Sequence, residues 1–168
     1  MTHLSAGVTG SMPSSTGIDG HVNLLSGWSM FTDQQLTYLR SRGLARIATV
    51  DVGGQPDVVP VAFECDGTYF WVGGSGLSVT HTRKFQNVMA GNRRVAIVVD
   101  DVVSFDPFIA RGIRTYGRAE GPIERVGMIG PGYFLRITPV ESWAWNMAGE
   151  PVGEEWYPAV HIRHEVSL

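Results

Sequence analysis

The chain has 168 residues, of which 43% are hydrophobic, and a formal net charge of −3 with a pI near 5.9. That length and composition fit a single domain with a real core, and the lack of a basic excess argues against nucleic-acid binding. The one cysteine, Cys65, rules out an internal disulfide framework and is expected to be a half-buried structural thiol. No apolar run approaches the roughly 20 residues of a membrane span. The chain also lacks a signal-peptide pattern, so a cytoplasmic protein without membrane contact is expected.

Residues 1–28 are rich in Gly, Ser and Thr and show little periodicity, so they are predicted to form a flexible N-terminal arm. Residues 29–168 are predicted to form a single domain. Its first element is a helix, because Thr32 and Gln35 have the spacing of a capping box. Gly43 is well placed to end that helix.

Three strand-like segments follow the helix, and two tight Gly-containing turns separate them. They span residues 44–52, 57–65 and 68–74. Short turns between β-branched and aromatic runs are typical of an antiparallel meander. Pro60 lies inside the second segment and cannot donate to a strand ladder, which indicates an edge strand, a bulge or a place where the backbone leaves the ladder.

The next stretch, residues 80–101, reads THTRKFQNVMAGNRRVAIVVDD. Its first half is polar and basic, and its second half is an apolar run that ends at two aspartates. Its first half predicts an amphipathic helix over 80–90. The apolar face of that helix comprises Phe85, Val88 and Met89, and the polar face comprises Thr80, Arg83, Lys84 and Asn87. Basic residues in a first helical turn oppose the helix dipole, and a bound phosphate would remove that conflict. The alternative is an ordinary solvated polar face.

Three further strands are predicted, over residues 93–101, 111–121 and 132–146, which makes six in total. Successive apolar residues over 95–99 indicate a strand buried on both faces. Six strands, mostly linked by hairpins and accompanied by a few short helices, predict a mainly β protein with the architecture of a small antiparallel barrel. A barrel also leaves few strand edges open.

Titratable side chains outside the predicted helix give weaker signals. His161 and His164 are close in sequence, but no Cys or acidic cluster joins them, so solvated side chains and no metal site are expected. Asp100 and Asp101 are expected to cap a turn at the end of their strand. Tyr116 is a candidate proton donor, although a core or interface tyrosine is the favoured interpretation.

Four motifs, taken in chain order, resemble one known family. They are GQPDVVPVAFE, TRKFQNVMAGNRRVAIVVDD, RGIRTYGRAEG and ITPVESWAWN, and together they cover about residues 30–147. The chain resembles the pyridoxamine 5'-phosphate oxidase-like split β-barrel proteins, and within them it is most similar to the coenzyme F420-dependent (deazaflavin) reductases of actinobacteria. The resemblance implies a six-stranded antiparallel FMN-binding split barrel and a homodimer with its cofactor sites at the interface.

The resemblance also implies which residues contact the cofactor. Those expected at its phosphate are Thr80, Thr82, Arg83 and Lys84, with Asn87 behind them. Those expected against its ring are Val58, Val59, Pro60 and Val61. Arg111 and Gly112 would approach from the partner chain, and Arg111, Arg114 or Arg118 could receive the anionic tail of coenzyme F420. Trp143 and Trp145 alternate onto one face of their strand, where they form either a wall of the cofactor site or core and dimer packing.

The activity that the resemblance implies is hydride transfer between coenzyme F420 and an electron-poor small-molecule substrate, in keeping with a role in secondary metabolism. The flavin-binding oxidases of the family carry a Gln that contacts the flavin where this chain has Gly112, so its absence favours coenzyme F420 over FMN. Two alternatives stay open: an FMN-dependent oxidoreductase like pyridoxamine-phosphate oxidase, and a non-catalytic protein that binds coenzyme F420 or a flavin. No catalytic side chain is identified.

Overall fold

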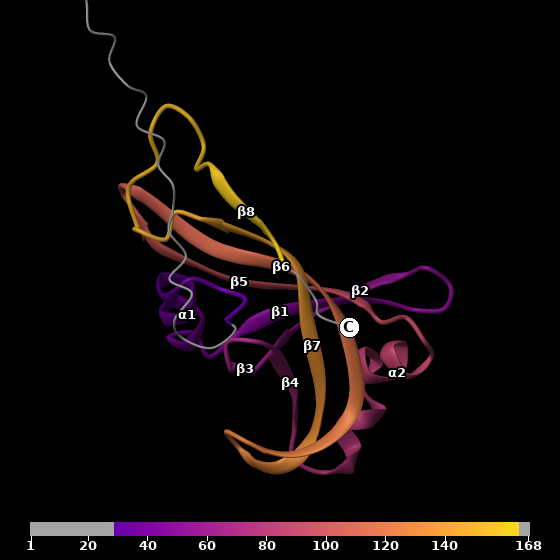
Figure 1. The fold of residues 1–168 in the computed structure, drawn as a ribbon. Helices are drawn as coiled ribbons and strands as arrows, with labels where there is room; N and C mark the ends of the chain where they lie inside the picture. The colour runs from indigo at the N-terminus through magenta and orange to yellow at the C-terminus, as the bar shows by residue number, and fades with distance from the viewer. Residues whose placement is uncertain (1–28, 165–168) are drawn as a thin grey trace, which may run out of the picture.

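The computed structural model of the protein describes residues 29–164 (Figure 1). The predicted N-terminal arm, residues 1–28, lies outside the described part. In chain order the elements are α1 (Asp33–Arg40), β1 (Ala45–Val50), β2 (Pro56–Val61), β3 (Phe63–Cys65), β4 (Phe70–Gly74), the 3-10 helix η1 (Leu77–His81), α2 (Arg83–Met89), β5 (Arg94–Phe105), β6 (Phe108–Gly127), β7 (Gly130–Trp145) and β8 (Ala159–Arg163). The predicted mainly β fold with short helices is confirmed.

The strands form one antiparallel sheet in the order β2-β1-β5-β6-β7-β4-β3, and β8 pairs with β7. β2 and β3 stand at opposite ends of this order, yet only Ala62 separates them in the chain. The sheet must therefore curl until its two ends meet, which is the architecture of a barrel. Figure 1 shows the long β6 and β7 strands curving around this barrel, with α1 and α2 on its outside.

The prediction of six strands is wrong, because the described residues form eight. The segment predicted over 57–65 breaks at Ala62, where the chain leaves β1 as its partner and begins to pair with β4. β8 is the second addition, and it pairs with residues 141–145 of β7. Pro60 lies in β2, an edge strand that pairs only with β1 within residues 29–164, which agrees with its missing amide.

One face of the sheet makes the core. Alternate residues of β5 and β6 are buried there, among them Val95, Ile97, Val99 and Ile113. The intervening residues, such as Val98, are only half-buried. The predicted burial of residues 95–99 on both faces is therefore wrong, because an antiparallel sheet needs only one apolar face against the core. The outer face of β5, β6 and β7 is open in the single chain.

The capping box at the start of α1 is confirmed. The Gln35 amide donates to the Thr32 hydroxyl over 3.2 Å, and the Thr32 amide donates to the Gln35 side-chain oxygen over 3.1 Å. The helix ends at Arg40 rather than at Gly43. Ser41 closes it with right-handed backbone angles, and its hydroxyl donates to the carbonyl of the last turn.

The helix predicted over 80–90 is two shorter elements, because Thr82 is extended (φ −71°, ψ 151°) between η1 and α2. Phe85 and Val88 are buried as predicted, but Met89 is 53% exposed and does not belong to the apolar face. The alternative of a solvated polar face does not hold for Thr80 and Asn87, which are buried. α2 packs against β1 and β6, which fixes its N-terminal end beside the β1–β2 hairpin.

Candidate functional site

A group of cations and hydroxyls surrounds the junction between η1 and α2. The Lys84 ammonium donates to the Thr82 hydroxyl over 3.2 Å. The same hydroxyl donates to the Val79 carbonyl over 2.7 Å and does not cap α2. The first turn of α2 carries Arg83 and Lys84 and no acidic residue. This donor set has the chemistry that binds a phosphate group.

Two carboxylates of the β1–β2 hairpin face these cations. Arg83 is 60% exposed and lies 3.9 Å from the Asp51 carboxylate. Burial lowers the pKa of Lys84, and the charge of Asp57 opposes that shift. One carboxylate oxygen of Asp57 is buried without a hydrogen-bond partner in the described part of the chain. Asp57 and Asp51 were not predicted as site residues, because strand pairing and not a local motif brings them there.

The two buried polar residues of this region make internal hydrogen bonds. The Asn87 amide donates to the Thr49 hydroxyl over 2.8 Å, which links α2 to β1. The Thr80 hydroxyl donates to the Leu77 carbonyl over 2.7 Å, and its own carbonyl accepts from Gln86. Both residues therefore hold the backbone that presents Thr82 and Lys84.

The residues predicted against the cofactor ring divide between the two faces of β2. Val58 and Pro60 point outward, and Val58 is 62% exposed. Val61 is buried and Val59 packs partly against the core. Only the outward pair presents its side chains to a ligand on the open face.

Trp145 lies directly over Gly112, its cross-strand partner. The ring carbon Cη2 of Trp145 is 2.7 Å from the position that a Cβ at residue 112 would occupy, and Asp100 Cβ is 3.0 Å from it. A side chain at this position would have to displace the indole ring. The glycine therefore allows the indole ring to lie where it does.

Arg111 is held within its own chain. Its guanidinium donates to Asp101 over 3.1 Å, and Arg42 contacts the same carboxylate at 3.3 Å. The Tyr38 hydroxyl also donates to Asp101, over 2.8 Å. Burial raises the pKa of Tyr38, and the hydrogen bond to Asp101 raises it further, while these donors lower the pKa of Asp101 against its own burial. The predicted turn at Asp101 is wrong, since β5 continues past it to Phe105; Asp100 pairs instead with Arg46.

Trp143 stands in an aromatic row on the outer face. Its ring stacks on His161 at 4.7 Å, nearly parallel, while the Arg114 guanidinium lies 4.3 Å from its centroid. Tyr116 meets the same ring edge-on at 4.9 Å and is 45% exposed, so it is not a core residue. Trp143 and Trp145 lie on one face of β7, as their alternation predicted.

The prediction of solvated histidines is wrong for His164, which is buried with its ring 2.9 Å from the Ser142 hydroxyl. His161 is exposed, as predicted, and stacks on Trp143. Burial lowers the pKa of His164. No three side chains among residues 29–164 are grouped to hold a metal ion. Cys65 is half-buried, as predicted, and burial raises its pKa to about 11.

Residues 31–124, more than half of the chain, match the family model described as pyridoxamine 5'-phosphate oxidase. The chain belongs to this family. It is also 44% identical, over 124 residues, to a 5a,11a-dehydrotetracycline/5a,11a-dehydrooxytetracycline reductase of Streptomyces rimosus. That alignment covers 71% of this chain and 86% of the relative. The family match and the reductase relative together support an oxidoreductase activity.

Solved structures agree on the fold of this member of the pyridoxamine 5'-phosphate oxidase family. A conserved hypothetical protein of Mycobacterium tuberculosis is 18% identical with a TM-score of 0.55, and the match covers 76% of this chain and 94% of that one. HupZ of Group A Streptococcus is 20% identical with a TM-score of 0.51, covering 73% and 100%. At these identities the likeness shows the fold alone. Within residues 29–164, no helix has the length and apolar character needed to cross a membrane.

Proposed function

We propose that this protein is a coenzyme F420-dependent reductase that transfers a hydride to a conjugated carbon–carbon double bond of a polycyclic small molecule. The reductase relative, named for 5a,11a-dehydrotetracyclines, supports this reaction class and this kind of acceptor. The choice of deazaflavin over flavin rests on one observation, the contact of Trp145 with Gly112, because the Gln of the flavin-binding oxidases would require the indole ring to move.

The residues at the η1–α2 junction fit the phosphate of such a cofactor. Lys84 and Arg83 supply positive charge, and the Thr82 hydroxyl supplies a directional contact beside Lys84. Half-burial of Lys84 strengthens its attraction for an anion, because less water screens the charge. Asn87 and Thr80 would act indirectly, through the hydrogen bonds that hold α2 and η1 in place.

The ring of the cofactor would lie along the outward side of β2. Val58 and Pro60 present apolar surface there, and Pro60 has no amide hydrogen to satisfy. The bound deazaflavin supplies the hydride. The chain itself binds, orients and shields the reactants from water, and none of these tasks needs an acid–base pair. Tyr116, on the open face, is our candidate for delivering the accompanying proton.

We further propose a homodimer in which the outer sheet face meets the partner near the cofactor. The aromatic pair of Trp143 and His161 on this face supports the arrangement, since aromatic side chains are enriched at interfaces. In that arrangement Arg111 and Gly112 of one protomer would reach the cofactor of the other. Analytical ultracentrifugation tests the dimer: a monomeric sedimentation coefficient at micromolar concentration contradicts it.

Titration of the purified protein with coenzyme F420 and with FMN, followed by fluorescence, tests the cofactor. Binding of coenzyme F420 and not FMN is the expected result, and the reverse preference would identify a flavin enzyme. Turnover is then measured with reduced coenzyme F420 and a 5a,11a-dehydrotetracycline. Cofactor binding without oxidation of reduced coenzyme F420, across a panel of polycyclic enones, would identify a carrier and overturn the reductase proposal.

A further inference from the structure

A concave surface lies on the outer face of the sheet, separate from the η1–α2 junction. It has a cavity volume of about 410 Å³. Its lining is apolar where Ala96, Gly117 and Val140 contribute, and it carries two guanidinium groups, those of Arg94 and Arg118. No part of the proposed phosphate or ring site accounts for this combination.

Arg94 and Arg118 face each other directly across β5 and β6. Both are exposed, and neither has an ion pair or hydrogen bond to any side chain of residues 29–164. Like charges directly opposite each other destabilise a sheet. Several other arginines on this protein do have acidic partners: Arg136 contacts Glu120 at 2.8 Å, and Arg163 contacts Glu141 at 3.5 Å. An anion bound between Arg94 and Arg118 would remove their repulsion.

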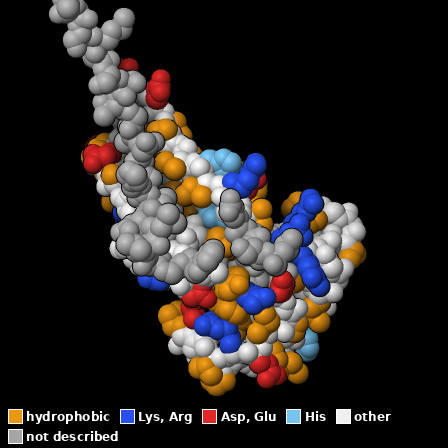
Figure 2. Space-filling model, in the orientation of Figure 1, with side chains coloured by type: hydrophobic (Ala, Val, Ile, Leu, Met, Phe, Trp, Pro, Cys, Tyr) orange, Lys and Arg blue, Asp and Glu red, His pale blue; other side chains and the backbone are white. Residues whose placement is uncertain are grey.

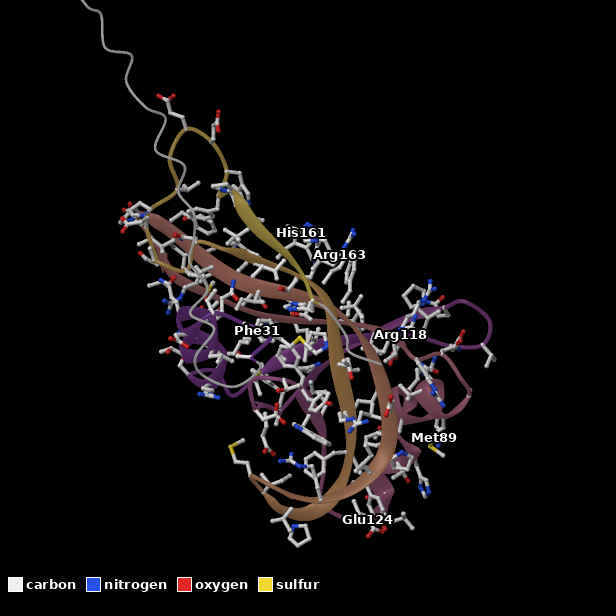
Figure 3. All side chains as sticks on the ribbon, in the orientation of Figure 1. Phe31, Met89, Arg118, Glu124, His161 and Arg163 are labelled. Carbon is white, nitrogen blue, oxygen red and sulfur yellow. The ribbon has the colours of Figure 1, made fainter. Side chains whose placement is uncertain are left out.

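Tyr116 adds an aromatic wall to the same cavity. Its ring meets Trp143 edge-on, so it is held in position while 45% of its surface stays exposed. Figure 3 shows Arg118 on the side of the sheet that also carries His161 and Arg163. Figure 2 shows Lys and Arg side chains gathered on this part of the visible face, beside hydrophobic ones. The cavity therefore offers an apolar lining, one aromatic ring and two unpaired cations.

We propose that Arg94 and Arg118 bind the ionised acidic group of the acceptor, a planar polycyclic molecule whose rings lie on Tyr116 and the apolar lining. This inference rests on the proposed function and adds to it the charge of the substrate. Two guanidinium groups match a carboxylate or an ionised β-dicarbonyl enol, both of which present paired oxygens. The acidic tail of coenzyme F420 is polar throughout and would leave the apolar lining unused.

The test compares an anionic and a neutral probe of the same ring skeleton, anilinonaphthalene sulfonate and N-phenylnaphthylamine, by fluorescence titration. The variants are Arg94→Gln, Arg118→Gln and the double variant. Each single change should raise the Kd of the sulfonate probe about tenfold, since a hydrogen bond to a charged group is lost. The Kd of the neutral probe should stay within about twofold. Arg93→Gln is the matched control, because Arg93 is an exposed neighbour that does not line the cavity.

Three results would overturn the inference. The first is an equal loss of sulfonate binding in Arg93→Gln, which would indicate general electrostatics. The second is unchanged sulfonate binding with weakened coenzyme F420 binding, which would assign the pair to the cofactor tail. The third is a change of oligomeric mass in the double variant, which would assign the pair to a subunit interface.

The wild-type protein provides an independent measurement that does not rely on the variants folding. Added salt should weaken binding of the sulfonate probe and leave the neutral probe unaffected, because exposed charges are screened. A sulfonate Kd that does not depend on salt contradicts the inference. Failure of the proposed function gives a different result, because the wild-type protein would then not bind coenzyme F420 at all.

Discussion

The indole ring of Trp145 occupies the space above Gly112, so that a side chain at position 112 and the tryptophan exclude each other. The two residues are cross-strand neighbours on β6 and β7, within the region where Arg111 is fixed by Asp101. A change at Gly112 therefore alters the wall of the proposed cofactor site through Trp145 and leaves the phosphate site intact.

Gly112→Gln should displace Trp145 and weaken coenzyme F420 binding by at least about tenfold, with a loss of about 1–3 kcal/mol in the free energy of unfolding from overpacking. Fluorescence titration and urea unfolding measure the two effects. Gly43→Gln is the control, because a Cβ there meets no atom within 4 Å. If Gly112→Gln bound coenzyme F420 as tightly as the wild type, Gly112 and Trp145 would not belong to the cofactor site.

Lys84→Ala should raise the Kd for coenzyme F420 by about 10- to 100-fold, because a half-buried charge–phosphate hydrogen bond is lost. Arg83→Ala should have a smaller effect, since that side chain is 60% exposed and already faces Asp51. In steady-state kinetics the apparent KM for the cofactor should rise with little change in kcat, because the phosphate is bound equally in the ground and transition states.

Arg40→Ala serves as the control for these charge deletions, because Arg40 is exposed and, within residues 29–164, its side chain donates a hydrogen bond to the carbonyl of Asp66. An unchanged affinity in Lys84→Ala would remove the η1–α2 junction from the cofactor site. A fall in kcat with an unchanged KM would mean instead that Lys84 acts in the chemical step.

The features that the sequence predicted well are those that depend on neighbouring residues. The capping box of Thr32 and Gln35 and the one-sided alternation of Trp143 and Trp145 are of this kind. The division of the helix at Thr82 was missed, because the sequence pattern continues through Thr82, whereas its backbone is extended between η1 and α2.

The strand register could not be predicted from the sequence, and most of the site depends on this register. Arg94 meets Arg118, and Trp145 meets Gly112, only because β5, β6 and β7 pair in one particular register. A shift by one residue would turn each side chain to the other face. The same limit explains why Asp57, on the partner strand of β1, was not recognised beside Lys84.

Asn87→Ala should lower the free energy of unfolding by about 1–3 kcal/mol, because the buried Thr49 hydroxyl loses its hydrogen-bond donor. Chemical denaturation measures this loss. Thr49→Val breaks the same bond, and the double variant should cost less than the sum of the two single changes. Additive losses would show that the two side chains do not stabilise each other, and α2 would then be held by other contacts.

The Cys65 thiol makes stability depend on alkaline pH. Burial raises its pKa from 9.0 to about 11, so between these values the folded protein binds more protons than the unfolded chain. Its contribution to the free energy of unfolding is therefore complete below pH 9 and is lost as the pH rises toward 11, by about 1.4 kcal/mol per pH unit at most.

The test compares Cys65→Ala with the wild type by urea unfolding at several pH values. Between pH 9 and 10.5 the free energy of unfolding should fall less steeply with pH in Cys65→Ala than in the wild type. The raised pKa of Tyr38 acts in the same direction above pH 10, in both proteins, so the comparison isolates the thiol. Equal slopes in the two proteins would show that the thiol ionises as readily in the folded state as in the unfolded chain.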